Sequence, residues 1–424
     1  MRRRDFLRQS AVAAAGLSMP GLLRSQVLAG TTKPAAKGKF RVGFIGVGGR
    51  ARHLMTAEGL ADHATIVAVA DCFLPRCDEA AKAVRGGDKW HKYQDYRQLL
   101  DKEKLDAVFV ATTTHARALI CIHAMQAGLD VYAEKPLTLT VAEGRPLISA
   151  ARKYKRILQT GTQQRSIPIN VYASKLVRDG AIGKVHTVVA CNFEGPAQWS
   201  PKPAEPTPQG LDWEQWCNQT ELRPYHPDLQ FKWALWRDYD GGGQSWGVTG
   251  WGTHALDQVQ CALGTDDTGP TEIWPEESGP NAKVTMRYGS GALLKLQGAK
   301  RQMEDLGAIF IGDKGRMEIM RGRVSTDLPE LLKDAPPNTP EGPGEAVEHL
   351  KNFFECMRTR RRPNADAEIA HRATTVCHLV NMCRELGRKL QWDPKAERFV
   401  GDDEANKLLS RPRRKGYELP QDTA

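Results

Sequence analysis

The sequence of 424 residues predicts an α/β protein, in which a parallel, doubly wound sheet is followed by a domain with a mostly antiparallel sheet. Two observations predict this fold class. From Lys39 to about Gly161, short β-rich runs alternate with segments of helix length, as in repeated β-α units. Beyond residue 180, strand-like runs follow one another with glycine turns between them, which is typical of antiparallel pairing.

The first half of the chain supplies strands and helices in strict alternation. The strands are expected over residues 41–45, 65–70, 107–111, 130–133 and 157–160. The helices are expected over residues 50–59, 75–85, 94–102, 115–127 and 141–154. Because a helix can return the chain to the same edge after each strand, these strands should lie parallel.

The second half begins with a helix over residues 167–179 and then changes in character. Its strands are expected over residues 184–194, 283–289, 292–299, 306–312 and 315–320. Hairpin signals lie at Gly289-Ser290-Gly291 and at residues 312–315. Residues 196–250 are rich in Pro, Gly and Trp and should form long loops that wall a site. A Pro-rich stretch then precedes two helices, over residues 345–359 and 366–388.

A glycine turn follows the first strand, where residues 46–51 match the pattern G-x-G-x-x-A. Gly46 permits a tight turn, Gly48 lets the backbone approach a pyrophosphate, and Ala51 lets the next helix pack closely. The start of that helix offers free N–H groups to the phosphate charge. We therefore assign Gly46, Gly48, Gly49 and Arg50 to the binding of a dinucleotide.

Asp71 ends the second strand, about twenty residues beyond the glycine turn. A carboxylate at this place accepts hydrogen bonds from the adenosine ribose hydroxyls and repels a 2′-phosphate, which favours NAD. Arg76 lies nearby and leaves NADP open.

The first residues predict a twin-arginine export signal over residues 1–29, with Arg3 and Arg4 as the pair. Val27-Leu28-Ala29 is similar to a cleavage site, and residues 30–38 form a linker. The leader predicts the twin-arginine export machinery as a partner and a periplasmic location. No uninterrupted apolar run reaches about 18 residues, so no stable membrane insertion is expected after cleavage.

The chain carries a formal charge of +10 at pH 7. Basic clusters at residues 358–362 and 411–415 flank helical segments and contain no interleaved aromatic residues. Solvated helix ends or subunit contacts are therefore favoured over nucleic-acid binding. The nine cysteines include no C-x-x-C pair, which argues against a zinc site, and no metal is expected.

Glu134-Lys135-Pro136 stands at the end of the fifth strand, where ligands of doubly wound sheets bind. The Lys135 ammonium can bond a substrate hydroxyl and stabilise a developing alkoxide. Glu134 can meet the nicotinamide ribose or orient Lys135.

Four segments together resemble the Gfo/Idh/MocA oxidoreductases: the glycine turn and residues 112–115, 134–136 and 161–165. The similarity runs from about Phe40 to Leu409. It implies an NAD(P)-binding Rossmann domain over residues 39–165, with Thr112, His115, Glu134 and Lys135 among the residues that bind the cofactor. It also implies a substrate and oligomerisation domain over residues 166–424, built on an open sheet, with C-terminal helices that return to the core and a homo-oligomeric assembly.

The resemblance further implies a catalytic cluster of the form D-x-x-x-H, in which the histidine is the general base. His254 fits this role, because a neutral imidazole can take the hydroxyl proton. The expected aspartate is replaced by Gly250, so another group must orient His254. Asp257 or Asp238 could substitute.

Tryptophan, arginine and amide side chains in residues 160–257 suit a sugar or polyol, because aromatic faces stack on C–H surfaces while polar groups bond hydroxyls. The assigned substrate-binding residues are Gln164, Arg165, Tyr225, Arg237, Trp251 and Asp257.

These observations predict an NAD(P)-dependent oxidoreductase that acts on a sugar, polyol or glycoside hydroxyl, with Lys135 and His254 as the catalytic residues. Since an exported protein meets little free NAD, the cofactor is expected to be tightly held. Two alternatives remain open: a redox-neutral, NAD-dependent glycoside hydrolase, and an NAD-binding sensor or scaffold with impaired catalysis.

Overall fold

The computed structural model describes residues 38–56, 60–298, 306–339 and 347–420. The predicted export signal, and the linker apart from Gly38, lie outside the described residues. Within the described ranges, none of the helices is both long and apolar enough to cross a membrane.

The first sheet has six strands in the order β3-β2-β1-β4-β5-β6, and all neighbours are parallel. Its strands are β1 Phe40–Ile45, β2 Ala64–Ala70, β3 His91–Tyr93, β4 Ala107–Val110, β5 Asp130–Ala133 and β6 Leu158–Thr160. The predicted doubly wound sheet is confirmed. The sequence missed β3, because this three-residue edge strand is mostly exposed and has no apolar pattern. The strand order reverses between β1 and β4, and ligands bind such sheets at this reversal.

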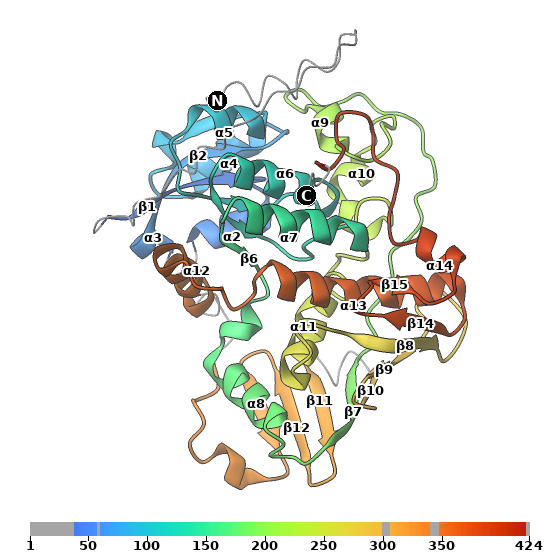
Figure 1. The fold of residues 1–424 in the computed structure, drawn as a ribbon. Coiled ribbons are helices and arrows are strands. Elements are labelled where there is room, and N and C mark those ends of the chain that lie inside the picture. Colours follow the sequence, from blue (N-terminus) through green and yellow to red (C-terminus); the bar gives the residue numbers. More distant parts are fainter. Residues whose placement is uncertain (1–37, 57–59, 299–305, 340–346, 421–424) are drawn as a thin grey trace.

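Helices cover both faces of this sheet (Figure 1). They are α2 Gly49–Thr56, α3 Leu60–His63, α4 Pro75–Ala83, α5 Tyr96–Lys102, α6 Thr114–Gln126 and α7 Gly144–Lys153. Most residues of α6 are buried, since α6 packs against both the sheet and α7. Helix α12 (Val347–Thr359) returns from the second half of the chain and packs Phe354 on Phe40 of β1, with the rings 5.7 Å apart.

The second sheet has nine strands in the order β13-β12-β11-β7-β10-β9-β8-β14-β15. They are β7 Val185–Cys191, β8 Pro270–Pro275, β9 Val284–Tyr288, β10 Leu293–Gly298, β11 Ala308–Gly312, β12 Arg316–Met320, β13 Arg323–Thr326, β14 Leu390–Asp393 and β15 Arg398–Phe399. Only β7 and β10 pair in parallel, so the predicted mostly antiparallel sheet is confirmed, with both predicted hairpins. The sequence missed β8, β13, β14 and β15, which are short or, in β8, bounded by prolines.

Three helices pack on this second sheet and form its core with it. They are α8 Pro168–Arg178, α11 Trp251–Leu263 and α13 Ala367–Leu386. In Figure 1, α11 lies between α8 and α13, with its first turn directed toward the first sheet. The start of α11 therefore belongs to the boundary between the two sheets.

Residues 196–250, here called the covering segment, contain short helical turns: α9 Trp213–Cys217, α10 Pro227–Phe231 and η4 Trp233–Leu235. Their aromatic side chains form a separate cluster, in which Trp213 stacks on Trp216 with the rings 4.5 Å apart. Leu211 forms a β-bridge with Phe73, just beyond β2. The covering segment is thereby held against the edge where the first sheet reverses its strand order.

Residues 408–420, here called the C-terminal strap, follow α14 (Asp403–Lys407) and hold the covering segment in place. Arg413 Nη1 donates to Glu143 Oε1 at 2.6 Å. Arg414 donates to the Glu214 carboxylate at 2.7 Å and to the Asn218 carbonyl at 2.8 Å. Tyr417 Oη also donates to Glu214, at 2.7 Å. The end of the chain thus clamps α9 from the outside.

Replacing Arg414 with Met should loosen α9, because the substitution removes the donor to Glu214 and Asn218. We expect a loss of about 1–2 kcal/mol in the free energy that opposes local opening of α9. Hydrogen exchange measured by mass spectrometry should show faster exchange in α9 and unchanged exchange in β1 and β4. Arg398→Met, at an exposed position, is the matched control. Equal α9 protection in both variants would contradict the assignment.

Candidate active site

The glycine turn between β1 and α2 depends on Gly46, whose φ is +79°. A Cβ at Gly46 would lie 2.8 Å from both the Ala111 carbonyl oxygen and the Thr112 nitrogen. The Gly46 N–H donates to the Ala70 carbonyl at 2.8 Å. Only glycine therefore closes this turn so near to the ends of β2 and β4.

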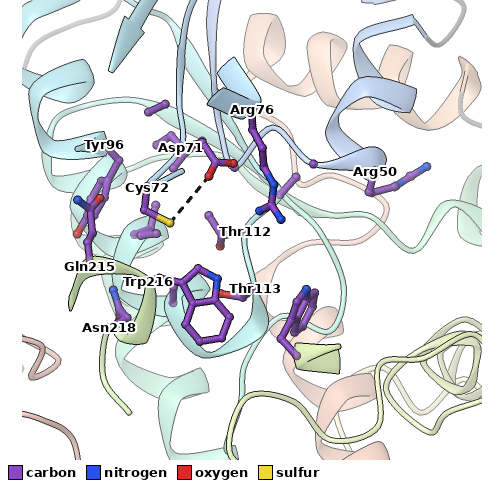
Figure 2. A pocket seen from close by; sticks show the side chains of 18 of the residues that line it. Arg50, Asp71, Cys72, Arg76, Tyr96, Thr112, Thr113, Gln215, Trp216 and Asn218 are labelled. Carbon is purple, nitrogen blue, oxygen red and sulfur yellow. Dashed lines mark hydrogen bonds between the residues drawn. The ribbon is translucent and has the colours of Figure 1, made fainter. Parts of the chain in front are cut away.

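Gly48 and Gly49 leave the next part of the turn open, because a Cβ at either position would meet nothing within 4 Å. Both line a cleft of about 330 Å³ at the carboxyl edge of the sheet (Figure 2). Helix α2 begins at Gly49 and has no acidic residue in its first turn. A phosphate group can therefore lie against this backbone and the helix N-terminus.

Asp71 lines the same cleft at the end of β2 and is 7% exposed. Its carboxylate accepts the N–H groups of Val47 at 3.0 Å and of Phe73 at 2.9 Å. Burial raises the pKa of Asp71, while Arg76 and these two amides oppose the rise. In Figure 2, Asp71 and Arg76 extend into one side of the cavity.

The opposite wall comes from the covering segment, which contributes Gln215, Trp216, Asn218 and Trp233. Thr112 Oγ1 and Trp216 Nε1 are buried polar atoms of the lining that have no hydrogen-bond partner within the protein. A groove with bare backbone for phosphate, a carboxylate for ribose hydroxyls and two free polar atoms fits a nicotinamide dinucleotide. Sequence motifs did not identify these four wall residues. Their only signal was the clustering of tryptophans.

Glu134 follows β5 and is 4% exposed. Its Oε1 accepts from Arg50 Nε at 2.7 Å, so Arg50 reaches across from α2. Burial acts to raise the pKa of Glu134, but Arg50 and Lys135 outweigh burial and hold that pKa below its ordinary value. Glu134 is therefore a charged carboxylate, and Arg50 compensates much of its charge.

Lys135 points from the end of β5 toward the second half of the chain. Its Nζ donates to the carbonyl oxygen of Gly250 at 3.0 Å, immediately before α11. Burial lowers the pKa of Lys135 to about 8, against the opposing effect of Glu134 and Asp240. An ammonium with this pKa can give up its proton near neutral pH.

His254 lies in the first turn of α11 and is 6% exposed. Its Nδ1 is buried and has no hydrogen-bond partner within the protein. Burial, together with Arg321 and Lys135, lowers the pKa of His254 well below its ordinary value. The imidazole is therefore neutral at pH 7. His254 follows by four residues the Gly250 carbonyl that binds Lys135, and the Lys135 charge acts on its pKa.

Gly250 stands where the family resemblance implies an aspartate, and the structure shows a steric reason for glycine at this position. A Cβ at this position would overlap the carbonyl oxygen of Gln244, so the extended turn of residues 241–250 leaves no space for a side chain. The carboxylates considered as substitutes are engaged elsewhere. Asp257 accepts from Arg165 at 2.7 Å, and Asp238 pairs with Arg223 at 2.7 Å.

The remaining predicted residues make contacts within the protein. His115 is fully buried, and its Nε2 lies 2.8 Å from the Trp216 carbonyl oxygen, so its ring supports the covering segment. Trp251 packs on Trp246 and directly follows Gly250, whose carbonyl binds Lys135. The others and their partners are Gln164 with the Leu306 carbonyl, Arg165 with Asp257 and Asp266, Tyr225 with Gln230, and Arg237 with Glu385.

Two sequence profiles of one protein family match the chain. The profile described as "Oxidoreductase family, NAD-binding Rossmann fold" matches residues 40–162. The profile described as "Oxidoreductase family, C-terminal alpha/beta domain" matches residues 169–419. The two profiles cover the two sheets one after the other.

Curated relatives match over shorter stretches. A glycosyl hydrolase family 109 protein of Shewanella pealeana is 30% identical over 177 residues, which are 37% of this chain and 38% of that protein. The D-apiose dehydrogenase of Paraburkholderia graminis is 31% identical over 159 residues, or 38% and 41%. The inositol 2-dehydrogenase of Salmonella typhimurium is 27% identical over 175 residues, or 40% and 50%. The chain thus spans half or less of the length of these relatives.

Solved structures match over most of the chain. The WlbA dehydrogenase of Bordetella pertussis, in complex with NADH and UDP-GlcNAcA, has a TM-score of 0.61 at 15% identity and covers 84% of this chain and 99% of its own. The aldose-aldose oxidoreductase of Caulobacter crescentus, complexed with glycerol, has a TM-score of 0.57 at 19% identity, with 84% and 100% covered. At these identities the likeness establishes the fold. Together with the two profiles, it shows that the chain belongs to the Gfo/Idh/MocA family of oxidoreductases and has an NAD-binding site.

Proposed function

We propose that the protein transfers a hydride between a tightly held nicotinamide cofactor and a hydroxyl-bearing carbon of a sugar, polyol or glycoside. The observation that carries this proposal is the hydrogen bond of Lys135 to the Gly250 carbonyl, four residues before His254 at the start of α11. Lys135 supplies a buried ammonium, and His254 a neutral imidazole with a free Nδ1. This pair suits removal of a hydroxyl proton beside a dinucleotide cleft.

The chemistry divides between the cofactor and these side chains. A bound nicotinamide ring would supply the acceptor for the hydrogen of the substrate C–H bond and its electron pair. Lys135 donates a hydrogen bond to the hydroxyl oxygen and stabilises the negative charge that develops there. His254 Nδ1 takes the hydroxyl proton, so that the carbon–oxygen bond becomes a carbonyl. Reduction runs through the same groups in reverse, with His254 returning the proton.

Sugar and polyol dehydrogenases among the relatives support the substrate class. A second candidate is redox-neutral glycoside hydrolysis. Two glycosyl hydrolase family 109 relatives, each 30% identical to this chain over the matched residues, favour it. In that cycle, oxidation of a ring hydroxyl acidifies the neighbouring C–H bond, the C1 substituent is eliminated, water adds, and the hydride returns. Both candidates use the same first step.

We also propose that the cofactor remains bound through many turnovers. The covering segment forms one wall of the cleft, and the C-terminal strap holds that wall in place. The Arg3-Arg4 leader supports export by the twin-arginine route to the periplasm with the cofactor already loaded.

The protein should retain its cofactor through purification. Denaturing it should release a nicotinamide dinucleotide, measurable by chromatography of the supernatant, in near-stoichiometric amount.

A native sample of the protein is incubated with sugars, polyols and aryl glycosides without added NAD. Ketone or reduced-sugar products support the oxidoreductase, and a released aglycone without net oxidation supports the glycosidase. Bound cofactor without turnover would favour a binding role, and absence of cofactor would contradict the held-cofactor proposal.

Turnover should depend on pH in a direction set by Lys135 and His254. The ammonium is present below its pKa of about 8, so kcat should fall as pH rises through that value. The imidazole stays neutral above its lowered pKa, so kcat should hold down to about pH 6. Cofactor binding, measured over the same range by fluorescence, serves as the control. A kcat that rises through pH 8 would contradict the role of Lys135.

Replacing His254 with Ala should lower kcat by about 10²–10⁴-fold, because the proton acceptor is lost. Bound cofactor per chain should be unchanged, since His254 is not among the residues that line the dinucleotide cleft. His186→Ala, which changes an exposed histidine of β7, is the matched control. Comparable kcat values for the two variants would exclude His254 as the base.

A further inference from the structure

We propose that Asp240 takes the place of the carboxylate missing at Gly250 and acts as the positioning residue that keeps Lys135 in its ammonium form. This inference rests on the proposed function only for its effect on turnover. The juxtaposition of Asp240, Lys135 and the start of α11 stands on the structure alone.

Asp240 lies in the covering segment, where its N–H donates to the Trp236 carbonyl at 2.9 Å, and it is completely buried. Each of its carboxylate oxygens accepts from one hydroxyl: Oδ2 from Thr114 and Oδ1 from Thr249. Thr114 starts α6, and Thr249 directly precedes Gly250, whose carbonyl binds Lys135. Asp240 therefore joins the start of α6 to the residue that precedes the carbonyl bound by Lys135.

The backbone is shaped around this carboxylate. A Cβ at Gly243 would lie 2.8 Å from the Asp240 Cγ and within 2.9 Å of both carboxylate oxygens. The same extended turn that excludes a side chain at Gly250 thus wraps around Asp240. This turn has glycine at position 250, where the family resemblance implies an aspartate, and it encloses the carboxylate of Asp240.

The partners of Asp240 differ from those of two other buried carboxylates, Asp130 and Asp257. Asp130 pairs with the Arg360 guanidinium at 2.6 Å, and Asp257 pairs with Arg165 at 2.7 Å. Asp240 instead accepts from two neutral threonine hydroxyls, which leave its charge uncompensated. Burial raises the pKa of Asp240, while the two hydroxyls and the cations Arg117 and Lys135 favour its charged form and oppose that rise.

The other acidic neighbour of Lys135 is Glu134, and that carboxylate already forms an ion pair. Glu134, which favours the Lys135 ammonium more than Asp240 does, pairs with Arg50 at 2.7 Å, and Arg50 itself disfavours that ammonium. The titratable and charged groups that act on or respond to Lys135 are Glu134, Asp240, Arg50, Arg117, His254 and Cys377. Arg50 and Arg117 disfavour the ammonium, as does burial. Asp240 is the carboxylate of this group that has no guanidinium bound to it.

The test neutralises Asp240 without changing its shape. In Asp240→Asn, the pKa of Lys135 should fall by about one unit or more, because an opposing charge is lost. The Lys135 pKa is read directly from the Nζ resonance of selectively ¹⁵N-lysine-labelled holoprotein, assigned by its absence in Lys135→Arg. The alkaline limb of kcat should move to lower pH by the same amount, with the cofactor content unchanged.

Two further sets of variants separate this role from a merely structural one. Asp130→Asn makes the same chemical change at a buried carboxylate at the start of β5, and it should leave the Lys135 pKa unchanged. Thr249→Val should shift the Lys135 pKa, because Asp240 loses a hydrogen bond, and Thr249→Ser should restore it. The threonine pair also tests the proposal if Asp240→Asn does not fold.

An unchanged Lys135 resonance in Asp240→Asn and Thr249→Val would overturn the proposal. So would an equal shift in Asp130→Asn. Because the resonance is read without substrate, failure of the proposed function gives a different result: the pKa shifts as expected, but no sugar or glycoside is turned over. A uniform loss of kcat at every pH with an unshifted Lys135 pKa would assign Asp240 a structural role only.

Discussion

The hydrogen bond from Lys135 to the Gly250 carbonyl is the contact on which the site depends. It joins the carboxyl end of β5 to the start of α11, and so couples the cofactor-binding sheet to the helix that carries His254. Burying the Lys135 ammonium at this boundary costs free energy, and the pKa of Lys135 is lowered for that reason. The neighbouring carboxylates offset that cost. The reactive character of Lys135 is therefore a property of the assembled chain and not of the first sheet alone.

The cofactor cleft is equally composite. One wall is the glycine turn, whose bare backbone at Gly48 and Gly49 faces open space. The other wall is the covering segment, which is rich in tryptophan and has little regular structure of its own. Aromatic stacking within that segment supplies the rigidity that hydrogen-bonded elements supply elsewhere. A largely irregular stretch of chain can thus serve as a defined surface for a ligand.

Sequence patterns predicted those parts of the molecule that arise from local periodicity. The parallel strands and the glycine turn at Gly46 depend on residues close together in the chain, and both were predicted. Short edge strands such as β3 and β15 carry too few residues for a pattern, and they form because a neighbouring strand is present. The pairing of Thr114 with Asp240 spans 126 positions, and no spacing rule connects the two. The roles assigned to Lys135 and His254 remain predictions.

The C-terminal strap has a consequence for the order in which the molecule is made. Arg414 and Tyr417 complete the support of α9, yet they leave the ribosome long after the glycine turn has emerged. The first sheet can fold early during synthesis, because its strands are contiguous in the chain. Its nucleotide groove stays without its supported outer wall until the strap has been synthesised. The groove is therefore more accessible in the interval before the strap docks than in the folded molecule.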